Sequence, residues 1–456
     1  MNRGTSVIRR NPVREWLTAN PLRLLPVSFA SLISLGTIVL MLPVSRANGS
    51  TVTWSESLFT ATSAVCVTGL TVVDTATGWS GFGQGVILGL IQLGGLGIVT
   101  LVSVAILLLS DRIGTGPVRA LAAEVGTDTF DSIKKLARTI VVTTIVFEVA
   151  VAVVLALRLY LSHDYDGWTS IAHGTFHSVS AWNNAGFSLY SDSMIGFASD
   201  FVVLGAISVA VIVGGLGFPV VRGLATHRHH WRRWSIHTRL VLSGTAVLLI
   251  AGFVGYLAFE WSNPDTLGAL GATDRVGGAM FMSIQPRTAG FHAVDVAALS
   301  EESVVVSIVL MFVGGGSAST AGGIKVTTFA LLAFVIWAEV RGDRDVNVFR
   351  RRIPESVQRL AVTVSLVGVG VLTMSTLALM VVGDGGLATS AFEAISALST
   401  VGLSNGLAAE QGGAGQILLT VLMFAGRLGP VALATAVTMR SRPNLFRYPT
   451  DQPLIG

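Results

Sequence analysis

Charged side chains are scarce in this sequence, at 12% of its 456 residues, while hydrophobic residues make up 51%. This charged fraction is about half of what soluble domains carry. A single cysteine, Cys66, excludes an intrachain disulfide, so cysteine usage says nothing about the redox compartment. No glycine-rich phosphate loop follows a strand pattern, and the motifs H-E-x-x-H and G-x-S-x-G are missing. We therefore expect a membrane protein that binds no nucleotide and is not an enzyme.

Long apolar runs separate the charged stretches of the sequence. Crossing the hydrocarbon layer of a bilayer takes about 20 apolar residues in a helix. Eight segments qualify, one of them interrupted by glycines at 314–325, so the sequence predicts an all-α protein with eight spans. The predicted spans are 24–42, 83–110, 139–157, 201–221, 240–259, 304–337, 360–382 and 417–439.

The positions of the basic residues predict an orientation. Eight spans put both termini on one side, together with the loops after the second, fourth and sixth spans. These segments hold most of the 30 Lys and Arg, and the opposite side holds more of the 26 acidic residues. The positive-inside rule then places both termini in the cytoplasm of a multi-pass protein of the cell (plasma) membrane. The net charge of +4 needs no nucleic-acid partner, because the basic stretches serve as cytoplasmic anchors.

Four shorter apolar segments, 54–65, 168–181, 277–284 and 387–398, cannot cross the bilayer and are typical of re-entrant helices. Each runs into a glycine, and these glycines recur with a period of roughly 110 residues. The sequence therefore predicts four tandem helix–pore loop–helix repeats around one central pore with pseudo-fourfold symmetry. The four glycines are Gly69, Gly186, Gly290 and Gly402, and the residues ten positions earlier are Phe59, Phe176, Met280 and Phe392.

The predicted repeats cover 24–110, 136–225, 236–339 and 357–439, between an N-terminal segment, 1–23, and a C-terminal tail, 440–456. A cluster of small residues follows each re-entrant glycine at a similar distance. Close helix packing also explains such clusters, but packing alone does not predict the shared distance. The clusters are Gly94-Gly95-Leu96-Gly97, Gly214-Gly215-Leu216-Gly217, Gly314-Gly315-Gly316-Ser317 and Gly426-Arg427-Leu428-Gly429.

The re-entrant glycines have the chemistry of a cation filter. A dehydrated cation needs substitute oxygen ligands, which rings of backbone carbonyls supply. Turning several carbonyls toward one axis requires backbone conformations that glycine adopts readily. Each glycine alone is also explained as a turn, but four at matched positions favour a selectivity filter. The predicted filter residues are Val67, Thr68 and Gly69, then Asn184, Ala185 and Gly186, then Thr288, Ala289 and Gly290, and finally Thr400, Val401 and Gly402.

These motifs resemble those of a known family. Thr400-Val401-Gly402-Leu403 is similar to the start of the potassium-channel signature T-V-G-Y-G. Over nearly its whole length the chain resembles the Trk/Ktr/HKT superfamily of potassium transporters, and most of all the Ktr-type membrane subunit. Further matching motifs are Trp182-Asn183-Asn184-Ala185-Gly186-Phe187, Arg287-Thr288-Ala289-Gly290-Phe291, Ser319-Thr320-Ala321-Gly322-Gly323-Ile324-Lys325 and the terminal Leu454-Ile455-Gly456.

The resemblance implies potassium uptake by a homodimer in which each subunit has its own pore. It also implies a cytosolic ring of nucleotide-binding regulatory subunits, and it places tails like 446–456 at the dimer interface. Potassium ion is then the substrate, whereas sodium dependence, the potassium-to-sodium ratio and channel-like or coupled transport stay open. Plant members that favour sodium often carry serine at the first filter position, where this sequence has Gly69.

The interrupted span is predicted to contain the gate. Glycine in a helix costs about 1 kcal/mol relative to alanine, so the glycines of 314–323 favour a loop. The resemblance implies that this loop lies beneath the filter and obstructs the pore until it moves. Lys325 is either an anchor at the membrane surface or a pore charge. The predicted gate residues are Gly314, Gly315, Gly316, Ser317, Gly322, Gly323, Lys325 and Arg427.

Several polar residues within or near the spans need separate interpretation. A charge inside the membrane is costly and usually faces a cavity, so Arg427 is expected at the pore, with a structural pair as the alternative. Glu148 is expected to be a buried structural partner rather than a proton carrier. Asp74 and Asp295 either concentrate cations at the outer mouth or cap backbone amides. The run 227–230, rich in histidine, is expected to be an anchor rather than a metal site.

Two other function classes fit the pattern less well. A secondary transporter for organic solutes usually has inverted repeats with the binding site between two halves, whereas these four repeats share one topology. An intramembrane enzyme needs a nucleophile with its base, or a metal cluster, and no such motif is present. The sequence therefore favours potassium transport.

Overall fold

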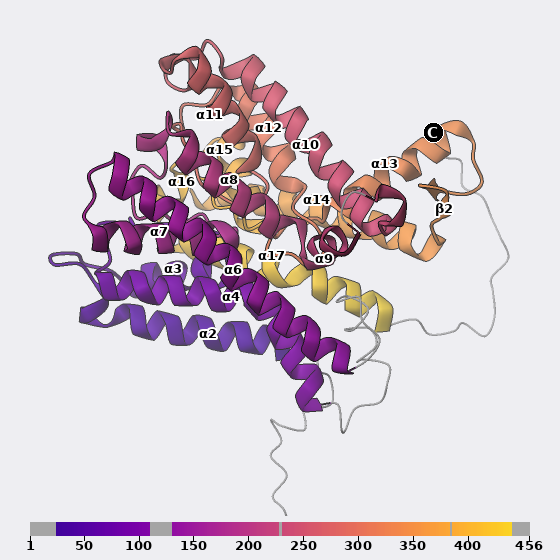
Figure 1. The fold of residues 1–456 in the computed structure, drawn as a ribbon, viewed down its shortest axis with the longest axis horizontal. Coiled ribbons are helices and arrows are strands. Elements are labelled where there is room, and N and C mark those ends of the chain that lie inside the picture. Colours follow the sequence, from indigo (N-terminus) through magenta and orange to yellow (C-terminus); the bar gives the residue numbers. More distant parts are fainter. Residues whose placement is uncertain (1–23, 110–129, 228–229, 384, 440–456) are drawn as a thin grey trace, which may run out of the picture.

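The computed structural model describes residues 24–109, 130–227, 230–383 and 385–439, and this part of the chain is almost entirely α-helical (Figure 1). One two-stranded hairpin, β1 (Asn347–Val348) with β2 (Arg351–Arg352), interrupts the helices. The helices are α2 (Leu24–Met41), α3 (Trp54–Cys66), α4 (Gly81–Leu109), α6 (Phe130–Ser162), α7 (Gly167–Trp182), α8 (Phe201–Leu216), α9 (Phe218–His227), α10 (Ile236–Glu260), α11 (Ala272–Ile284), α12 (Glu301–Phe312), α13 (Val326–Arg341), α14 (Glu355–Val382), α15 (Leu387–Leu398), α16 (Leu407–Glu410) and α17 (Gly413–Met439).

Several helices have the length and composition of membrane spans. Within the described ranges, three helices are long and apolar enough to cross a bilayer: Arg138–Ser162, Ile236–Glu260 and Glu355–Val382. Large apolar side chains are exposed on them, such as Val146 and Leu366, as expected where lipid replaces water. Shorter apolar helices occupy Leu25–Met41, Gly81–Leu96, Leu387–Leu398 and Gly413–Gly429.

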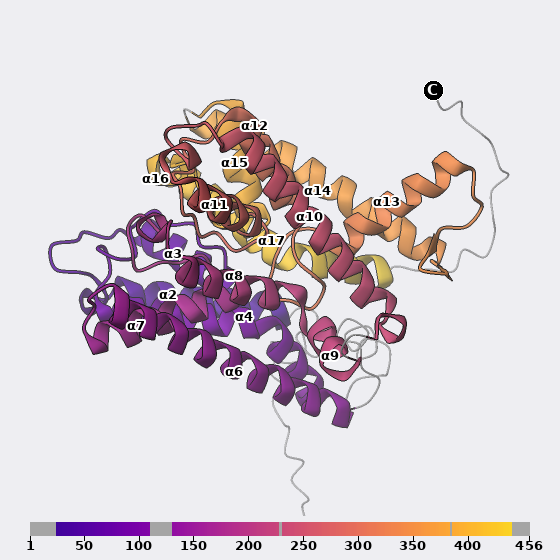
Figure 2. The same ribbon diagram turned by 45° about the horizontal axis from the view of Figure 1, so that its top comes forward.

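The short helices α3, α7, α11 and α15 pack among the long ones. Helix α3 contacts α2, α4 and α17, while α7 contacts α6 and α8. Helix α11 packs on α10 and α8, and α15 packs on α14, α17 and α12. In Figures 1 and 2 the four lie in the same half of the molecule, away from α9, α13 and β2. All four predicted re-entrant segments are thus helices, and α3 begins at a capping box between Thr53 and Glu56.

The predicted span 201–221 is wrong in one respect, because the helix breaks. Helices α8 and α9 meet at a bend of 98°. Gly217 between them is left-handed at φ +89°, and a Cβ there would lie 2.5 Å from the Ser317 carbonyl oxygen. The Phe218 amide donates to the Ala318 carbonyl at 3.2 Å instead of continuing the helix. The break therefore makes room for a segment about 100 residues further along the chain, which local sequence does not reveal.

The predicted interruption of 304–337 is present. Helix α12 ends at Phe312 and α13 begins at Val326. Between them, the Gly314 amide donates to the Ile324 carbonyl at 2.8 Å and the Val326 amide to the Gly315 carbonyl at 3.0 Å. Residues 314–325, called the glycine loop below, are therefore tied together at their two ends.

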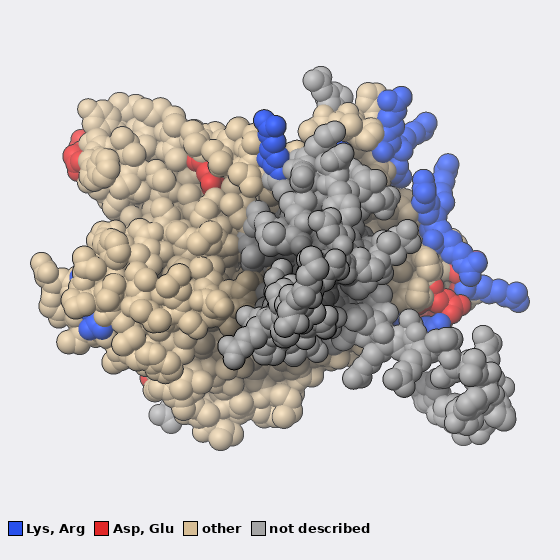
Figure 3. All heavy atoms as spheres, turned by 90° about the horizontal axis from the view of Figure 1, so that it is seen from below, with Lys and Arg blue, Asp and Glu red and all other residues tan. Residues whose placement is uncertain are grey.

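Basic side chains gather at one end of the molecule. Figure 3 shows most of the visible Lys and Arg at the end where α13 and β2 lie in Figure 1. Exposed arginines of this region are Arg341, Arg344, Arg350, Arg351, Arg352 and Arg359. The end opposite the short helices is therefore rich in basic side chains.

Candidate functional site

The four predicted filter segments meet one another at the centre of the molecule. A Cβ on Gly69 would lie 2.2 Å from the Ala185 carbonyl oxygen, and one on Gly186 would lie 2.7 Å from that of Ala289. In the same way, a Cβ on Gly290 would lie 2.5 Å from the Val401 carbonyl oxygen, and one on Gly402 would lie 2.2 Å from that of Thr68. Each segment thus touches the next in chain order and the fourth touches the first, so the contacts form a closed cycle.

The four segments share an unusual backbone. Besides the glycines, the residue two positions earlier is left-handed in every segment, at φ between 51° and 68°. Three of these residues are β-branched, and for such side chains a positive φ is a genuine outlier. A strained conformation repeated at one matched position indicates a functional constraint. The residues are Val67, Asn184, Thr288 and Thr400.

The backbone amides of these segments donate hydrogen bonds to their own short helices. The Thr68 amide donates to the Ser63 carbonyl at 2.8 Å, and the Gly69 amide donates to Ser63 Oγ at 3.1 Å. The Gly402 amide and Ser396 Oγ repeat this second bond at 3.1 Å. The carbonyls point elsewhere: within the described part of the chain, no donor bonds those of Thr68, Ala185, Ala289 and Val401.

Buried hydroxyl groups add to these free carbonyls. The Oγ1 atoms of Thr68, Thr288 and Thr400 are buried and have no hydrogen-bond partner among the described residues. Buried polar groups are nearly always satisfied, so free hydroxyls beside free carbonyls are suited to a dehydrated cation or to water. The arrangement offers oxygen ligands only, which suits hard cations.

The small-residue clusters have a packing role that explains their spacing. A Cβ on Gly94 would lie 2.0 Å from the Val65 carbonyl oxygen, and one on Gly214 would lie 2.1 Å from that of Trp182. Gly426 has the same relation to the Leu398 carbonyl at 1.8 Å. In these three cases the glycine admits the carbonyl four residues before the filter glycine. Gly314 differs, because a Cβ on it would lie 2.0 Å from the carbonyl oxygen of Gly322, which belongs to its own loop.

The glycine loop lies directly against the bases of two filter segments. Thr320 Oγ1 donates to the Trp182 carbonyl and to Asn184 Oδ1, both at 3.3 Å. A Cβ on Gly322 would lie 2.0 Å from Thr400 Oγ1. The loop therefore joins the second segment to the fourth, and in the cycle of contacts these two do not neighbour each other.

Two predicted gate side chains bind the loop. Arg427 of α17 is buried, and its Nη1 donates to the Thr320 carbonyl at 2.5 Å. Its Nε and Nη2 have no hydrogen-bond partner in the described ranges. Lys325 Nζ donates to the Ala321 carbonyl at 2.6 Å. The structure thus brings Arg427 to the loop, where its partner is a backbone carbonyl.

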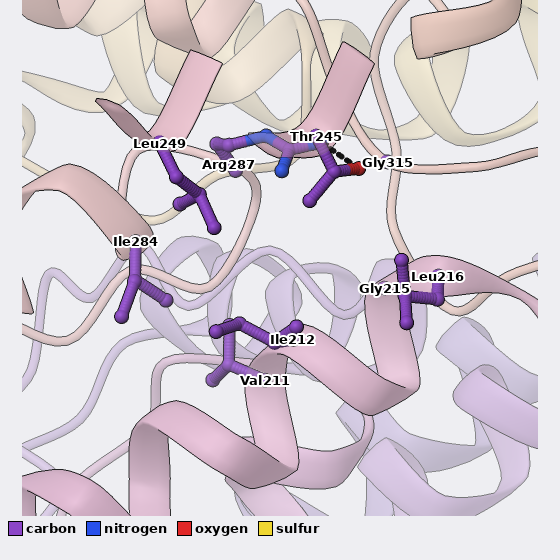
Figure 4. A pocket seen from close by; sticks show the side chains of 9 residues that line it. All are labelled: Val211, Ile212, Gly215, Leu216, Thr245, Leu249, Ile284, Arg287 and Gly315. Atoms are coloured by element: carbon purple, nitrogen blue, oxygen red, sulfur yellow. Dashed lines mark hydrogen bonds between the residues drawn. The ribbon is translucent and has the colours of Figure 1, made fainter. Parts of the chain in front are cut away.

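A second buried arginine, Arg287, was missed in the sequence analysis except as part of a motif. Its Nη2 lies 3.3 Å from both Thr245 Oγ1 and the Gly314 carbonyl oxygen, at the start of the glycine loop. Figure 4 shows Arg287 reaching Thr245 above a small cavity lined by α8, α10 and the loop. Its position three residues before Gly290, directly before the predicted filter residues, was the available signal.

Glu148 belongs to a buried hydrogen-bonded group. Its Oε2 accepts from Gln92 Nε2 at 3.1 Å, and its Oε1 accepts from Asn183 Nδ2 at 3.2 Å. Asn183 Nδ2 also donates to Gln92 Oε1 at 2.8 Å. The group joins α4, α6 and the second filter segment, as expected of a structural partner.

The two outer aspartates accept hydrogen bonds from nearby groups. Asp74 accepts from the Ala76 amide at 3.0 Å and from Ser191 Oγ at 2.5 Å, and Asp295 accepts from the Ala297 amide at 2.9 Å. These contacts favour capping. Cys66 is buried.

Some predictions fall outside the described residues. The segments 1–23 and 440–456, including the tail 446–456, lie outside, as do residues 228–229 of the histidine run. Within the described ranges no group of three or more His, Cys, Asp and Glu is placed to hold a metal ion.

Comparisons with known proteins agree with this geometry. The family model TrkH, described as cation transport protein, matches residues 12–448. Ktr system potassium uptake protein B of Bacillus subtilis is 35% identical, with 98% of this chain and 100% of that protein covered. Ktr system potassium uptake protein B of Vibrio alginolyticus is 36% identical, covering 95% of this chain and 94% of that protein.

A third relative and a solved structure also match. Potassium/sodium uptake protein NtpJ of Enterococcus hirae is 33% identical over 98% of this chain and 100% of its own length. The crystal structure of the potassium transporter TrkH from Vibrio parahaemolyticus shares the fold, with a TM-score of 0.70 at 19% identity, over 98% of this chain and 88% of that one. The resemblance seen in the motifs is confirmed: this chain belongs to the TrkH family of cation transport proteins, which are ion transporters and not enzymes.

Proposed function

We propose that this chain carries potassium across the cell membrane through a selectivity filter made by its four filter segments. The chain would form four tandem repeats, 24–110, 136–225, 236–339 and 357–439, with eight spans in pseudo-fourfold order around one pore. The filter residues are those at 67–69, 184–186, 288–290 and 400–402. The printed names of the Bacillus and Vibrio relatives, which are potassium uptake proteins, support potassium as the substrate.

The observation that carries the proposal is the repeated backbone of the filter segments. All four have a left-handed residue two positions before a left-handed glycine. Their amides bond the short helices, while the carbonyls between the two left-handed positions accept no hydrogen bond from the described residues. Because these carbonyls lie against the next segment in a cycle, they are suited to replace the hydration shell of a cation.

We further propose that the glycine loop is the gate. It bridges the bases of two segments that do not neighbour each other, through Thr320 and Gly322. A loop in that place obstructs a path running between the four segments. Arg427 holds the loop by one charge-assisted hydrogen bond and brings a positive charge near the cation path. Gly314, Gly315, Gly316, Ser317, Gly322, Gly323 and Lys325 belong to the same gate.

Orientation and assembly complete the proposal. The end where Lys and Arg gather in Figure 3 would face the cytoplasm, with both termini on that side. A homodimer with one pore in each subunit, and a cytosolic nucleotide-binding ring acting on the glycine loop, are proposed from the family resemblance. The name of the Enterococcus relative, a potassium/sodium uptake protein, makes sodium the first ion to compare with potassium.

Flux through the purified protein in liposomes tests the function. We expect rubidium or potassium uptake along a gradient, stronger than sodium uptake, and measured with and without sodium present. A protein carrying Gly402→Ser serves as a filter variant in matched vesicles and should lose preference for potassium. Vesicles in which sodium enters as fast as potassium would contradict the proposed selectivity, and vesicles that take up neither ion above the empty control would contradict the function.

A further inference from the structure

The short helices differ at one matched position that faces the chain just after the filter. Nine residues before the four filter glycines stand Thr60, His177, Phe281 and Glu393. Two of these, His177 and Glu393, are buried hydrogen-bonding side chains in the second and fourth segments. In the cycle of glycine contacts each of these segments touches only the first and third, so the two lie across the centre from each other.

His177 bonds the chain two and three residues after Gly186. Its Nε2 lies 3.1 Å from Ser188 Oγ and accepts from the Leu189 amide at 3.2 Å. Since an amide can only donate, Nε2 is the unprotonated ring nitrogen. The proton then sits on Nδ1, which donates to the His173 carbonyl at 2.8 Å. The imidazole is held on both sides and stacks on Tyr190 at 4.8 Å between ring centroids.

Glu393 makes the corresponding contact in the fourth segment. Its Oε1 accepts from Ser404 Oγ and from the Ala408 amide, the second bond at 3.4 Å. Ser404 stands two residues after Gly402, as Ser188 stands two residues after Gly186. Although one acceptor is an imidazole and the other a carboxylate, both bond the serine at the same place in the segment.

The other two segments lack this connection. Thr60 Oγ1 is buried and has no hydrogen-bond partner in the part of the chain that the structure describes. Phe281 has no polar atom in its side chain. At this matched position, hydrogen bonds from the short helix to the chain after the filter therefore occur within the second and within the fourth segment, which lie opposite each other, and the filter is held unequally along its two diagonals.

The position of these bonds suggests what they do. Each bond joins a residue nine positions before the glycine to a residue two positions after it. Both left-handed residues of the segment therefore lie between the two bonded residues. Strained backbone persists only where the surroundings over-determine it. A contact that fixes both sides of the strained pair keeps the carbonyls between them at a constant distance from the opposite segment.

We propose that His177 and Glu393 are positioning residues that set the potassium-to-sodium selectivity by bracing the second and fourth filter segments. This inference rests on the proposed function and adds to it the residues that hold the filter width. A ring of carbonyls discriminates against a smaller cation by its size as long as the ring cannot shrink around that cation. Losing a brace should therefore admit sodium rather than abolish potassium flux.

The test is the potassium-to-sodium flux ratio in liposomes with matched variants. His177→Leu and Glu393→Leu remove the acceptor, and we expect the ratio to fall by about threefold to tenfold, as for the loss of one or two net hydrogen bonds. His177→Gln and Glu393→Gln keep an oxygen acceptor and should retain most of the ratio. Thr60→Val, at the matched position in the first segment, removes a hydroxyl that has no partner among the described residues and should leave the ratio unchanged.

Each outcome decides the proposal. A lower ratio in both Leu variants with rescue in the Gln variants supports it, and an unchanged ratio in the Leu variants overturns it. An equal loss in Thr60→Val also overturns it, because general packing would then be the cause. If a Leu variant does not reach the membrane, Ser188→Ala and Ser404→Ala decide by the same measure. A wild-type protein without potassium preference would instead contradict the proposed function itself.

Discussion

At the scale of single residues, each filter segment requires a glycine and also has a strained residue two positions before that glycine. Left-handed backbone costs of the order of 1–3 kcal/mol at a residue with a Cβ, and Val67, Asn184, Thr288 and Thr400 all adopt it. The glycines two positions later avoid that cost and also leave room for the neighbouring carbonyl. Any side chain at these glycines therefore meets two obstacles, an unfavourable φ and a backbone oxygen.

Replacing the first of these glycines should weaken selectivity. In Gly69→Ser the new Cβ would meet the Ala185 carbonyl oxygen at 2.2 Å while φ stays near +90°. Since left-handed backbone costs an L-residue roughly 1–2 kcal/mol, we expect the potassium-to-sodium uptake ratio to fall by about tenfold. The measurement is uptake of both ions in cells that lack other potassium importers.

Gly85→Ser is the matched control for this substitution. Gly85 lies on α4, and a Cβ added there would have no other atom within 4 Å, so its substitution should leave the ratio at the wild-type value. If Gly69→Ser is expressed as well as Gly85→Ser and has the same ratio, Gly69 does not belong to the filter.

At the scale of elements, the glycine loop is held in place by few bonds of several kinds. The Gly316 amide donates to the Gly215 carbonyl at 2.8 Å, Thr320 bonds the second filter segment, and Arg427 bonds the Thr320 carbonyl. Arg287 adds a contact at Gly314. Because each bond contributes only a modest net free energy, the loop can be released without unfolding the helices around it.

Weakening the loop should raise flux through the isolated protein. We expect a deletion within 315–319 to increase potassium flux in liposomes without any cytosolic partner. Arg427→Ala should increase it less than the deletion does, by about tenfold, because a hydrogen bond to a charged group contributes at least about 1.5 kcal/mol and the loop keeps its other bonds. The loss of a positive charge near the path acts in the same direction.

Arg359→Ala provides the comparison for the arginine. Arg359 is exposed on α14 and pairs only with Glu355, four residues earlier, among its described ion pairs. Its flux should equal that of wild type at equal protein. Should the deletion and Arg427→Ala both conduct no faster than Arg359→Ala, the loop and the arginine are structural and the gate lies elsewhere.

At the scale of the whole molecule, apolar side chains cover much of the described surface. Large exposed residues on the long helices, such as Val254 and Leu366, suit contact with lipid. Such a surface does not select an interface between two copies, because lipid chains are as apolar as the side chains themselves. Contacts outside the lipid-facing helices would give the proposed dimer a specificity that apolar contact alone does not supply.

The C-terminal tail is our candidate for those contacts. Removing 446–456, which carry Phe446, Arg447 and Tyr448, should shift the detergent-solubilised protein from dimer toward monomer. Light scattering coupled to size-exclusion chromatography measures the change, and liposome flux should persist because each subunit of the proposed dimer would have its own pore. A tail-less protein that still scatters as a dimer would place the interface elsewhere.

Much of this protein could be predicted from local sequence. Apolar run length predicted the long helices, the period of roughly 110 residues predicted the positions of the four short helices and of the left-handed glycines that follow them, and the glycines of 314–323 predicted the break between α12 and α13. These features depend on residues close together in the chain, or on a pattern that repeats along it. The motifs also indicate the Trk/Ktr/HKT superfamily, a resemblance that the match to the TrkH family confirms.

Contacts between distant segments were decided only by tertiary structure. The break at Gly217, the bond from Arg427 to Thr320 and the place of Arg287 all depend on which helices lie side by side. Hydrophobic patterning cannot select such neighbours within a bilayer, because packing and hydrogen bonds, not transfer from water, drive helices together there.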